Sequence, residues 1–333
     1  MQFQRLLAGV LVALGSLPAK SNAQDTIQTL VGSTRVALDL SYMRPVYSYF
    51  RGSGAALPFI NDHWQAGLSP TWEVDGGVQH YYLSGGAEAV ANYYPVSSGR
   101  WLPYVGAFAS QRGATFATGN GTYGVQAGYL HFLSPSLAFR SEFRFRHSDV
   151  GAASNSEDVL VSLDPYLFGR ANRRLTALPA FGIFDVNLFA DYTLRPTHSL
   201  AVNATLAPFL TRWLQAGSTA NMVFAFYRSS GSHVLELFGR GYLPVATRVV
   251  PFAELFVGNE SLGQSYQTLG SHGTRAGLRT YLTPGVALDL ALQWRTYDTE
   301  TMGPSKSSTS TPPPNRTFRA TMTTQFRARR ARD

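Results

Sequence analysis

The 333-residue chain contains no cysteine and almost no lysine. Without cysteine, a disulfide framework, thiolate metal ligands and a lipid-anchored cysteine are all excluded. Beyond the first 23 residues no apolar run approaches the roughly 20 residues that a membrane-spanning helix needs. Helical periodicity is scarce, whereas 31 glycines and 18 prolines interrupt the chain at short intervals. These absences predict an all-β protein stabilised by its backbone hydrogen bonds and its packing.

The N-terminus has the pattern of a secretory signal peptide. Arg5 supplies a positive charge, residues 6–17 (LLAGVLVALGSL) form a short apolar stretch, and Ser21-Asn22-Ala23 places small residues at a cleavage site. The alternative is a frayed N-terminal helix of a cytosolic protein. We expect residues 1–23 to be a cleaved signal peptide and residues 24–333 to be the mature, exported chain.

Positive charge exceeds negative charge, with 28 basic and 20 acidic residues. Removing the signal peptide leaves a net charge of +6, nearly all of it from arginine, because Lys306 is then the only lysine. A basic chain can indicate nucleic-acid binding. Export argues against that partner, and the arginines are scattered through predicted strands. We therefore predict no nucleic-acid partner and assign the charge to a surface or a lumen.

A period of two dominates the mature chain. In residues 124–149 apolar residues alternate with Arg140, Glu142, Arg144 and Arg146, and in residues 273–298 they alternate with Asp289, Gln293 and Arg295. The strands run about ten residues or more, near the 9–11 that cross a bilayer at a tilt. Soluble strands average about five to six. We predict a membrane barrel, with a secreted β-sandwich as the alternative.

Aromatic residues and loops support the barrel. Aromatic residues gather near strand ends, which is typical of the two girdles of a membrane barrel: Tyr93, Tyr94, Trp101, Tyr104, Phe132 and Tyr281. Tight turns are expected at 133–136 and 282–285. Longer polar loops are expected at 111–122, 148–158, 258–272 and 299–316. Alternation of short turns and longer loops is the pattern expected of such a barrel.

The chain also contains an internal repeat. Residues 124–149 and 273–298 share eight of 26 letters, and further segments match at the same spacing of about 150 residues. We define repeat unit one as 33–170 and repeat unit two as 182–330, each with room for eight strands. The predicted fold is an antiparallel transmembrane β-barrel of about 16 strands, within a range of 12 to 16, from two similar halves. Two tandem eight-stranded barrels are the alternative.

Two observations favour a single barrel. The link at 169–179 is short for two separate bodies in a membrane. The predicted inward faces carry long charged residues, and Glu142, Asp289 and Glu254 are too few carboxylates to pair all the arginines. An eight-stranded interior is filled by side chains, whereas about 16 strands leave a channel. The predicted pore-lining residues are Arg144, Arg146, Arg275, Arg279, Arg295, Arg319, Glu142 and Asp289, and the excess of arginine predicts weak anion selectivity.

One half carries a recognisable order of motifs. Leu102-Pro103-Tyr104-Val105-Gly106 is followed by a loop, Gly124-x-x-Ala127-Gly128, a Leu-Ser-Pro turn and the segment from Ala138 to Arg146. This pattern resembles the small outer-membrane β-barrels of Gram-negative bacteria, the opacity-protein-like and OmpA-barrel group. Many such chains end on an aromatic residue read by the assembly machinery, whereas here Phe326 is followed by RARRARD.

Catalytic and metal sites are not supported. His147-Ser148 and His198-Ser199 are adjacent pairs, whose side chains point to opposite faces of a strand and so cannot form a nucleophile–base dyad. Glu142 is expected to form a salt bridge across the lumen instead. The remaining histidines have no partner at ligand spacing. We predict no enzyme, no cofactor and no metal.

The function expected from these features is a passive pore for small solutes in the outer membrane. A structural or adhesive barrel that displays its loops, without a pore, is the alternative. The expected partners are outer-membrane lipids and lipopolysaccharide, the barrel-assembly machinery and, for a pore, small solutes.

Overall fold

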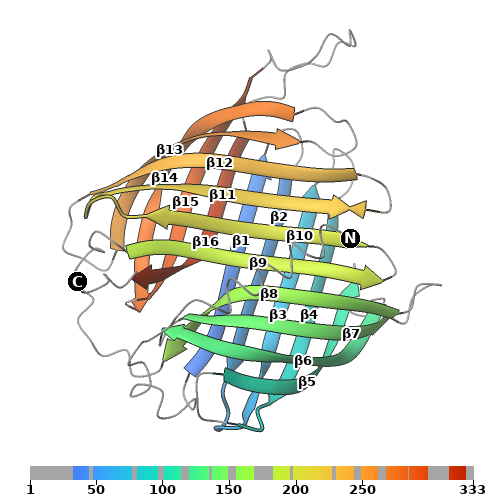
Figure 1. Ribbon diagram of the computed structural model, residues 1–333. Coiled ribbons are helices and arrows are strands. Elements are labelled where there is room, and N and C mark those ends of the chain that lie inside the picture. The colour runs from blue at the N-terminus through green and yellow to red at the C-terminus, as the bar shows by residue number, and fades with distance from the viewer. Residues whose placement is uncertain are drawn as a thin grey trace.

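Sixteen antiparallel strands make up nearly all of the described chain (Figure 1). The computed structural model describes residues 33–44, 48–76, 81–96, 101–113, 120–134, 137–148, 155–168, 183–195, 198–226, 230–243, 249–261, 268–283, 285–298 and 315–327. The strands are β1 (Ser33–Arg44), β2 (Ser48–Pro58), β3 (Trp64–Gly76), β4 (Tyr81–Tyr93), β5 (Trp101–Gly113), β6 (Asn120–Ser134), β7 (Leu137–Ser148), β8 (Asn155–Phe168), β9 (Ile183–Arg195), β10 (Ser199–Pro208), β11 (Leu214–Ala225), β12 (Ser230–Tyr242), β13 (Val249–Ser261), β14 (Thr268–Thr283), β15 (Val286–Tyr297) and β16 (Asn315–Arg327).

The strands form a closed barrel in which sequence neighbours pair and β1 pairs with β16. The prediction of an antiparallel barrel of about 16 strands is confirmed. In Figure 1 the strands of the front wall cross those of the back wall at a steep angle, as strand tilt in a barrel requires. Among the described residues, no helix is long and apolar enough to cross a membrane.

The strands are longer than the sequence pattern predicts. The expected loop at 111–122 is shortened at both ends, because β5 continues to Gly113 and β6 begins at Asn120. The same holds at 148–158 and 258–272, where strands extend into the expected loops. Those loop boundaries were wrong because polar residues near a strand end keep the backbone ladder while facing solvent. The tight turns expected at 133–136 and 282–285 lie partly outside the described residues, and the strands beside them show register shifts between Phe132 and Ser134 and between Tyr281 and Thr283.

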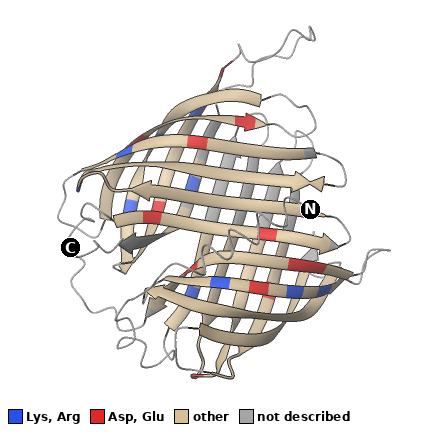
Figure 2. Cartoon of the chain, viewed as in Figure 1, with Lys and Arg blue, Asp and Glu red and all other residues tan. Residues whose placement is uncertain are grey.

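The two faces of the wall differ in polarity. Large apolar residues on the outer face are exposed, including Leu68, Val105, Val125, Leu237, Leu255, Val257 and Leu292. The inner face carries buried polar and charged residues such as Gln126, Arg144, Glu254 and Arg275. Charged residues therefore lie along the strands and are not confined to the turns (Figure 2). This arrangement is the reverse of a soluble barrel, whose interior is apolar.

The barrel closes differently at its two ends. At one end β1 pairs with β16 and β8 pairs with β9, so one ring of sixteen strands is closed. At the other end β1 pairs with β8, and β9 pairs with β16, so each half also closes on itself. We call these ends the joined rim and the split rim. The two fold alternatives drawn from the sequence therefore coexist along the length of one molecule.

The strands of the two halves have matching spacing. β5 and β13 begin 148 residues apart, β7 and β15 149, and β1 and β9 150. Matching isolated bridges follow β2 and β10, Phe59 to Gln65 and Phe209 to Gln215. The spacing agrees with the sequence match, although the repeat and its boundaries remain an interpretation of the sequence. The signal peptide and the link at 169–179 lie outside the described residues.

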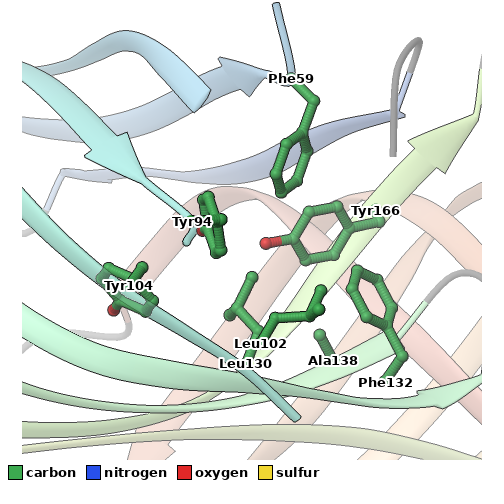
Figure 3. Packing of buried hydrophobic residues seen from close by; sticks show 8 residues of the cluster. All are labelled: Phe59, Tyr94, Leu102, Tyr104, Leu130, Phe132, Ala138 and Tyr166. Carbon is green, nitrogen blue, oxygen red and sulfur yellow. The ribbon is translucent and has the colours of Figure 1, made fainter. Parts of the chain in front are cut away.

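Each half has an apolar cluster inside the split rim. In the first half Tyr166 lies among Phe59, Tyr94 and Phe132, with ring centroids 5.0 Å from Phe132 and 6.4 Å from Phe59 (Figure 3). The second half has an equivalent cluster around Phe209, Tyr242 and Phe252. These buried rings pack inside each half at the split rim.

Only part of the expected aromatic girdle faces outward. Tyr93 and Trp101 are exposed, and Trp101 stacks on His131 with centroids 4.3 Å apart. The girdle assignment was wrong for Tyr94, Tyr104, Phe132 and Tyr281, which are all buried inside. Strand alternation explains this result, because neighbours such as Tyr93 and Tyr94 face opposite sides of the wall.

Glycines in β6 and β14 allow strands and rings to approach closely. A Cβ at Gly273 would lie 2.0 Å from the carbonyl oxygen of Trp294 and 2.7 Å from the ring of Phe256. Gly124 has the same relation to the ring of Phe108. A Cβ at Gly239, in contrast, meets nothing within 4 Å.

We expect Gly273→Ala to destabilise the folded barrel by about 1–3 kcal/mol, because the added methyl overpacks the wall. Gly239→Ala, with open space around it, is the matched control and should change the unfolding free energy little. Urea titration of both variants in detergent measures the difference. Equal midpoints for the two variants would contradict this packing.

Candidate functional site: two buried ion-pair networks in the lumen

The inward faces of the strands bring arginines and carboxylates together in two networks. The carboxylate partners of each arginine lie on strands of the same half of the barrel, in some cases on the same strand as the arginine. The alternation of β-strands places every second residue inside, so residues two apart on β7 or β14 enter the same network. We call these groups the first-half network and the second-half network.

Glu142 on β7 is the centre of the first-half network. Its carboxylate accepts from Arg144 Nε at 2.5 Å and lies 3.0 Å from Arg140, and the Tyr104 hydroxyl donates to it. Arg144 also reaches Glu88 on β4 at 3.1 Å, across the interior. Glu142 is almost fully buried and forms ion pairs, but its partners Arg140 and Arg144 lie on the same strand, so the predicted salt bridge of Glu142 across the lumen was wrong.

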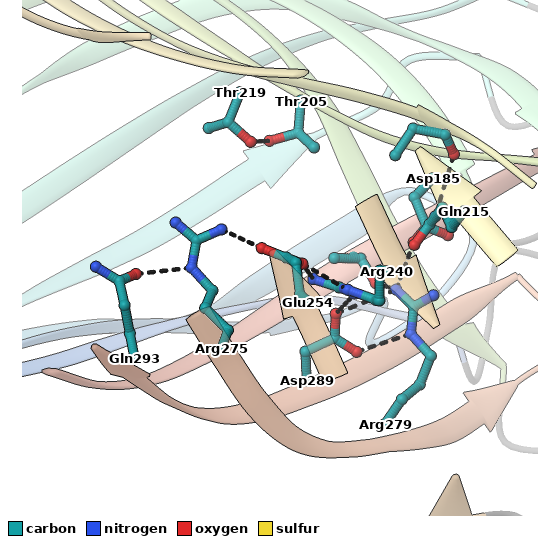
Figure 4. Close-up of polar contacts among 12 residues, drawn as sticks. Asp185, Thr205, Gln215, Thr219, Arg240, Glu254, Arg275, Arg279, Asp289 and Gln293 are labelled. Atoms are coloured by element: carbon teal, nitrogen blue, oxygen red, sulfur yellow. Dashed lines mark hydrogen bonds and ion pairs between the residues drawn. The ribbon is translucent and has the colours of Figure 1, made fainter. Parts of the chain in front are cut away.

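Arg279 on β14 is the centre of the second-half network (Figure 4). Its guanidinium donates to Asp289 at 2.7 Å, to Asp185 at 2.5 Å and to the hydroxyl of Tyr242 at 2.7 Å. The side chain is 0% exposed, so water does not share these bonds. Arg240 then links Asp289 to Glu254, at 2.7 Å from each.

The second-half network continues toward the joined rim. Arg275 pairs with both Glu254 and Glu236, and its Nε donates to Gln293 at 2.7 Å. Arg295 pairs with Glu236 and, at 2.7 Å, with Glu260. The ring of Phe256 lies beneath Arg275 at 4.2 Å, which adds a cation–π contact to a desolvated charge. Charges of both signs therefore alternate along the interior.

Both networks also join the first and last strand of their own half. In the first half Asp164 on β8 lies 3.4 Å from Arg35 on β1 and 2.8 Å from Arg140. In the second half Arg279 contacts Asp185 on β9 and donates to Thr323 on β16 at 2.8 Å. We call Arg35–Asp164 and Asp185–Arg279–Thr323 the two clamps. Each clamp lies at the split rim, where that half closes on itself.

The structure places seven of the eight sequence-predicted lumen residues in these networks. Arg144, Arg275, Arg279, Arg295, Glu142 and Asp289 are buried and paired, and Arg146 is partly exposed, 3.4 Å from Asp158. Arg319, the eighth, is half-buried on β16 and near enough to Glu236 for electrostatic interaction. Their role as pore-lining residues remains a prediction.

The expectation that carboxylates are too few was wrong. The sequence-based prediction overlooked several inward acidic residues, Glu88, Asp158, Asp164, Asp185, Glu236 and Glu260, and two inward arginines, Arg35 and Arg240. Arg140 was placed on the correct face of its strand but was left out of the predicted pore lining. The strand period was the signal that could have found them. Asp158, for example, shares its face with the inward residues Asp164 and Tyr166 of β8.

The polar contacts of the described histidines His147 and His272 are with residues outside the two networks. His147 contacts Asn155 on the neighbouring β8 at 2.8 Å and lies beside Tyr123 on the exposed side. In the part of the chain that the structure describes, no group of three His, Asp or Glu is arranged to hold a metal ion.

Comparisons with known proteins give only distant likenesses. No protein-family model and no curated protein matches the chain. Among solved structures, a bacterial polysaccharide outer membrane secretin matches 90% of this chain and 99% of its own at 10% identity and a TM-score of 0.44. The outer membrane protein OprD from Pseudomonas aeruginosa (92% and 97%, 8% identity, 0.34) and BamA from Haemophilus ducreyi lacking POTRA domains 1–3 (88% and 70%, 10% identity, 0.43) also match. At these TM-scores the likeness does not bear on the function of this chain.

Removing a central carboxylate tests the networks. We expect Glu142→Gln to lower the unfolding free energy by about 3 kcal/mol, because Arg140 and Arg144 lose a buried counter-charge. Glu88→Gln is the control, since the Glu88 side chain is 21% exposed and water compensates for much of the loss, to under about 1 kcal/mol. Urea unfolding in detergent compares the two. A larger loss of unfolding free energy for Glu88→Gln than for Glu142→Gln would contradict the central position of Glu142 in the first-half network.

Proposed function

We propose that this chain is an integral outer-membrane β-barrel, exported through its N-terminal signal peptide and built from two copies of an eight-stranded unit. The reversed polarity of the wall is the observation that carries this proposal. Leu255, for example, is 68% exposed on the outer face, whereas its neighbour Glu254 is buried inside in an ion pair. In water such a surface would aggregate, while in lipid it is solvated and the closed ladder satisfies the backbone.

We further propose that the barrel is a passive pore for small solutes. The support is the charged interior combined with closure by sixteen strands at the joined rim. Charged side chains of both signs line this lumen, and they can replace the hydration shell of a polar solute. The eight residues predicted from the sequence, from Glu142 to Arg319, lie on strands that bound this lumen.

A structural or adhesive barrel without a pore is the second candidate. The filled interior at the split rim favours this candidate. The Arg279 side chain and the aromatic clusters of both halves are buried there. In both cases the partners we propose are outer-membrane lipids and lipopolysaccharide and, during assembly, the barrel-assembly machinery. The resemblance to opacity-protein-like barrels remains part of this proposal.

Charge selectivity follows from the pairing. The sequence predicted weak anion selectivity from an excess of unpaired arginine. The predicted lumen arginines are matched by carboxylates: Arg144, Arg146, Arg275, Arg279 and Arg295 form ion pairs, and Arg319 interacts electrostatically with Glu236. We therefore propose that any anion preference is small and comes from partly exposed residues such as Arg146 and Arg319.

A charge on the outer face distinguishes a membrane barrel from a soluble one. We expect Leu255→Arg to destabilise the barrel in lipid by about 2–4 kcal/mol, because the arginine would face the hydrocarbon region. Ile60→Arg is the control, since Ile60 is 64% exposed but lies in the turn after β2. Outer-membrane yield and heat-modifiable gel migration in a Gram-negative host measure both. Unchanged yield for Leu255→Arg, with recovery as a soluble protein, would overturn the membrane assignment.

Conductance tests the pore. Purified protein in a planar bilayer should give discrete current steps with weak ion selectivity. Reversal potentials in a salt gradient measure that selectivity, and Arg146→Gln should shift them slightly toward cations. The absence of steps from correctly folded, heat-modifiable protein would favour the structural barrel.

A further inference from the structure

Four strands change partners between the two rims without changing register. At the split rim position 34 of β1 lies opposite 167 of β8, and position 184 of β9 lies opposite 326 of β16. If the ladders of the joined rim, in which Asp39 faces Thr321 and Ser162 faces Phe189, continued unchanged, position 34 would face 326 and position 167 would face 184. The same four positions therefore meet in either arrangement.

The same regrouping is possible at three consecutive residue positions of these strands. The split-rim pairs 33–168 and 183–327, and 35–166 and 185–325, regroup in the same way. A slip of one residue would turn every side chain of a strand to the other face, which normally prevents exchange of partners. Here each strand keeps its register, so its inward and outward residues stay where they are.

The crossing point is marked by backbone that has a neighbour on one side only. Among the described pairings, Val36–Leu38 of β1 pair with β2 but with neither β8 nor β16. In β8 the corresponding gap spans 163–165 and contains Pro165, a residue that has no N–H to donate and occurs in strands at such edges. Short unpaired segments at this level make a natural point for the ladders to separate.

We propose that the four-strand seam is a gate. In the split state, which is the arrangement of this structure, each half closes on itself at the split rim, where its own side chains fill it and close it to solutes. In the joined state β1 pairs with β16, and β8 with β9, along their whole length, so that the two interiors merge into one lumen. This proposal rests on the proposed pore function.

The two clamps hold the split state. Arg35–Asp164 joins β1 to β8, and Asp185–Arg279–Thr323 joins β9 to β16. Both clamps connect strands that separate in the joined state, so each must break when the gate opens. The ion pairs of Arg295 on β15, with Glu236 on β12 and Glu260 on β13, lie within the second half and join none of the four strands that exchange partners.

Disulfide trapping tests the seam directly, because the chain has no cysteine of its own. One variant carries Thr34→Cys, Leu167→Cys, Phe184→Cys and Phe326→Cys together. The split state gives disulfides 34–167 and 184–326, and the joined state gives 34–326 and 167–184, which proteolysis and mass spectrometry tell apart. Val161→Cys with Ala190→Cys is the control, since this β8–β9 pair is the same in both states.

In oxidised outer membranes we expect both patterns, with the split pattern in the majority. Adding Arg279→Gln should raise the joined fraction severalfold, whereas adding Arg295→Gln should leave the ratio unchanged. A joined pattern that stays absent even with Arg279→Gln would overturn the proposal, as would an absent split pattern while the control pair forms.

Conductance of the trapped forms completes the test and separates this proposal from the pore itself. The double variant at 34 and 167, once oxidised, should lose most of its current and regain it in reductant. The double variant at 34 and 326 should stay conducting when oxidised. Equal currents in the two locked forms would overturn the gate. If both disulfide patterns form but none of the variants conducts, the strands do exchange partners at the seam, and the proposed pore function is wrong.

Discussion

Closure of the backbone ladder is the constraint on which the rest of this structure depends. A strand left with a free edge has a row of unpaired N–H and C=O groups, which is costly in lipid and a template for aggregation in water. Each of the sixteen strands has a hydrogen-bonded neighbour on both sides over most of its length. Because the wall must close, alternation assigns one face of every strand to the interior and the other to the surroundings.

The interior then has to accommodate long charged side chains. Removing a charge from water costs several kcal/mol unless it is paired and its hydrogen bonds are satisfied. Arg279 meets this requirement with two carboxylates, a tyrosine and a threonine drawn from four other strands. The networks therefore act across the barrel, whereas the ladder acts only between neighbours. Together they determine both the cross-section and the strands that meet at the split rim.

The two halves satisfy the same requirement with different residues. Arg140 on β7 and Asp289 on β15 occupy corresponding positions 149 residues apart, yet their charges are opposite. Arg140 finds Asp164 on β8, and Asp289 finds Arg279, where the first half has the apolar Leu130. Each network is therefore complementary only within its own half. This complementarity explains why the halves close separately at the split rim, although their strands are spaced alike.

The sequence by itself determined the strand class and the inward face of β7 and β15, and it predicted the number of strands only as about 16 within a range of 12 to 16. The period of two is local, and it places Glu142, Arg144 and Asp289 inside regardless of what they meet. Partners were not predictable in this way. Glu88 and Arg144 are 56 residues apart, and Asp185 and Arg279 are 94 apart, so only closure of the barrel brings them together. The choice between one barrel and two was also beyond a local pattern, because it depends on which of two register-compatible partners β1, β8, β9 and β16 take. Only the tertiary structure decided this. One ring of sixteen strands closes at the joined rim, and each half closes on itself at the split rim.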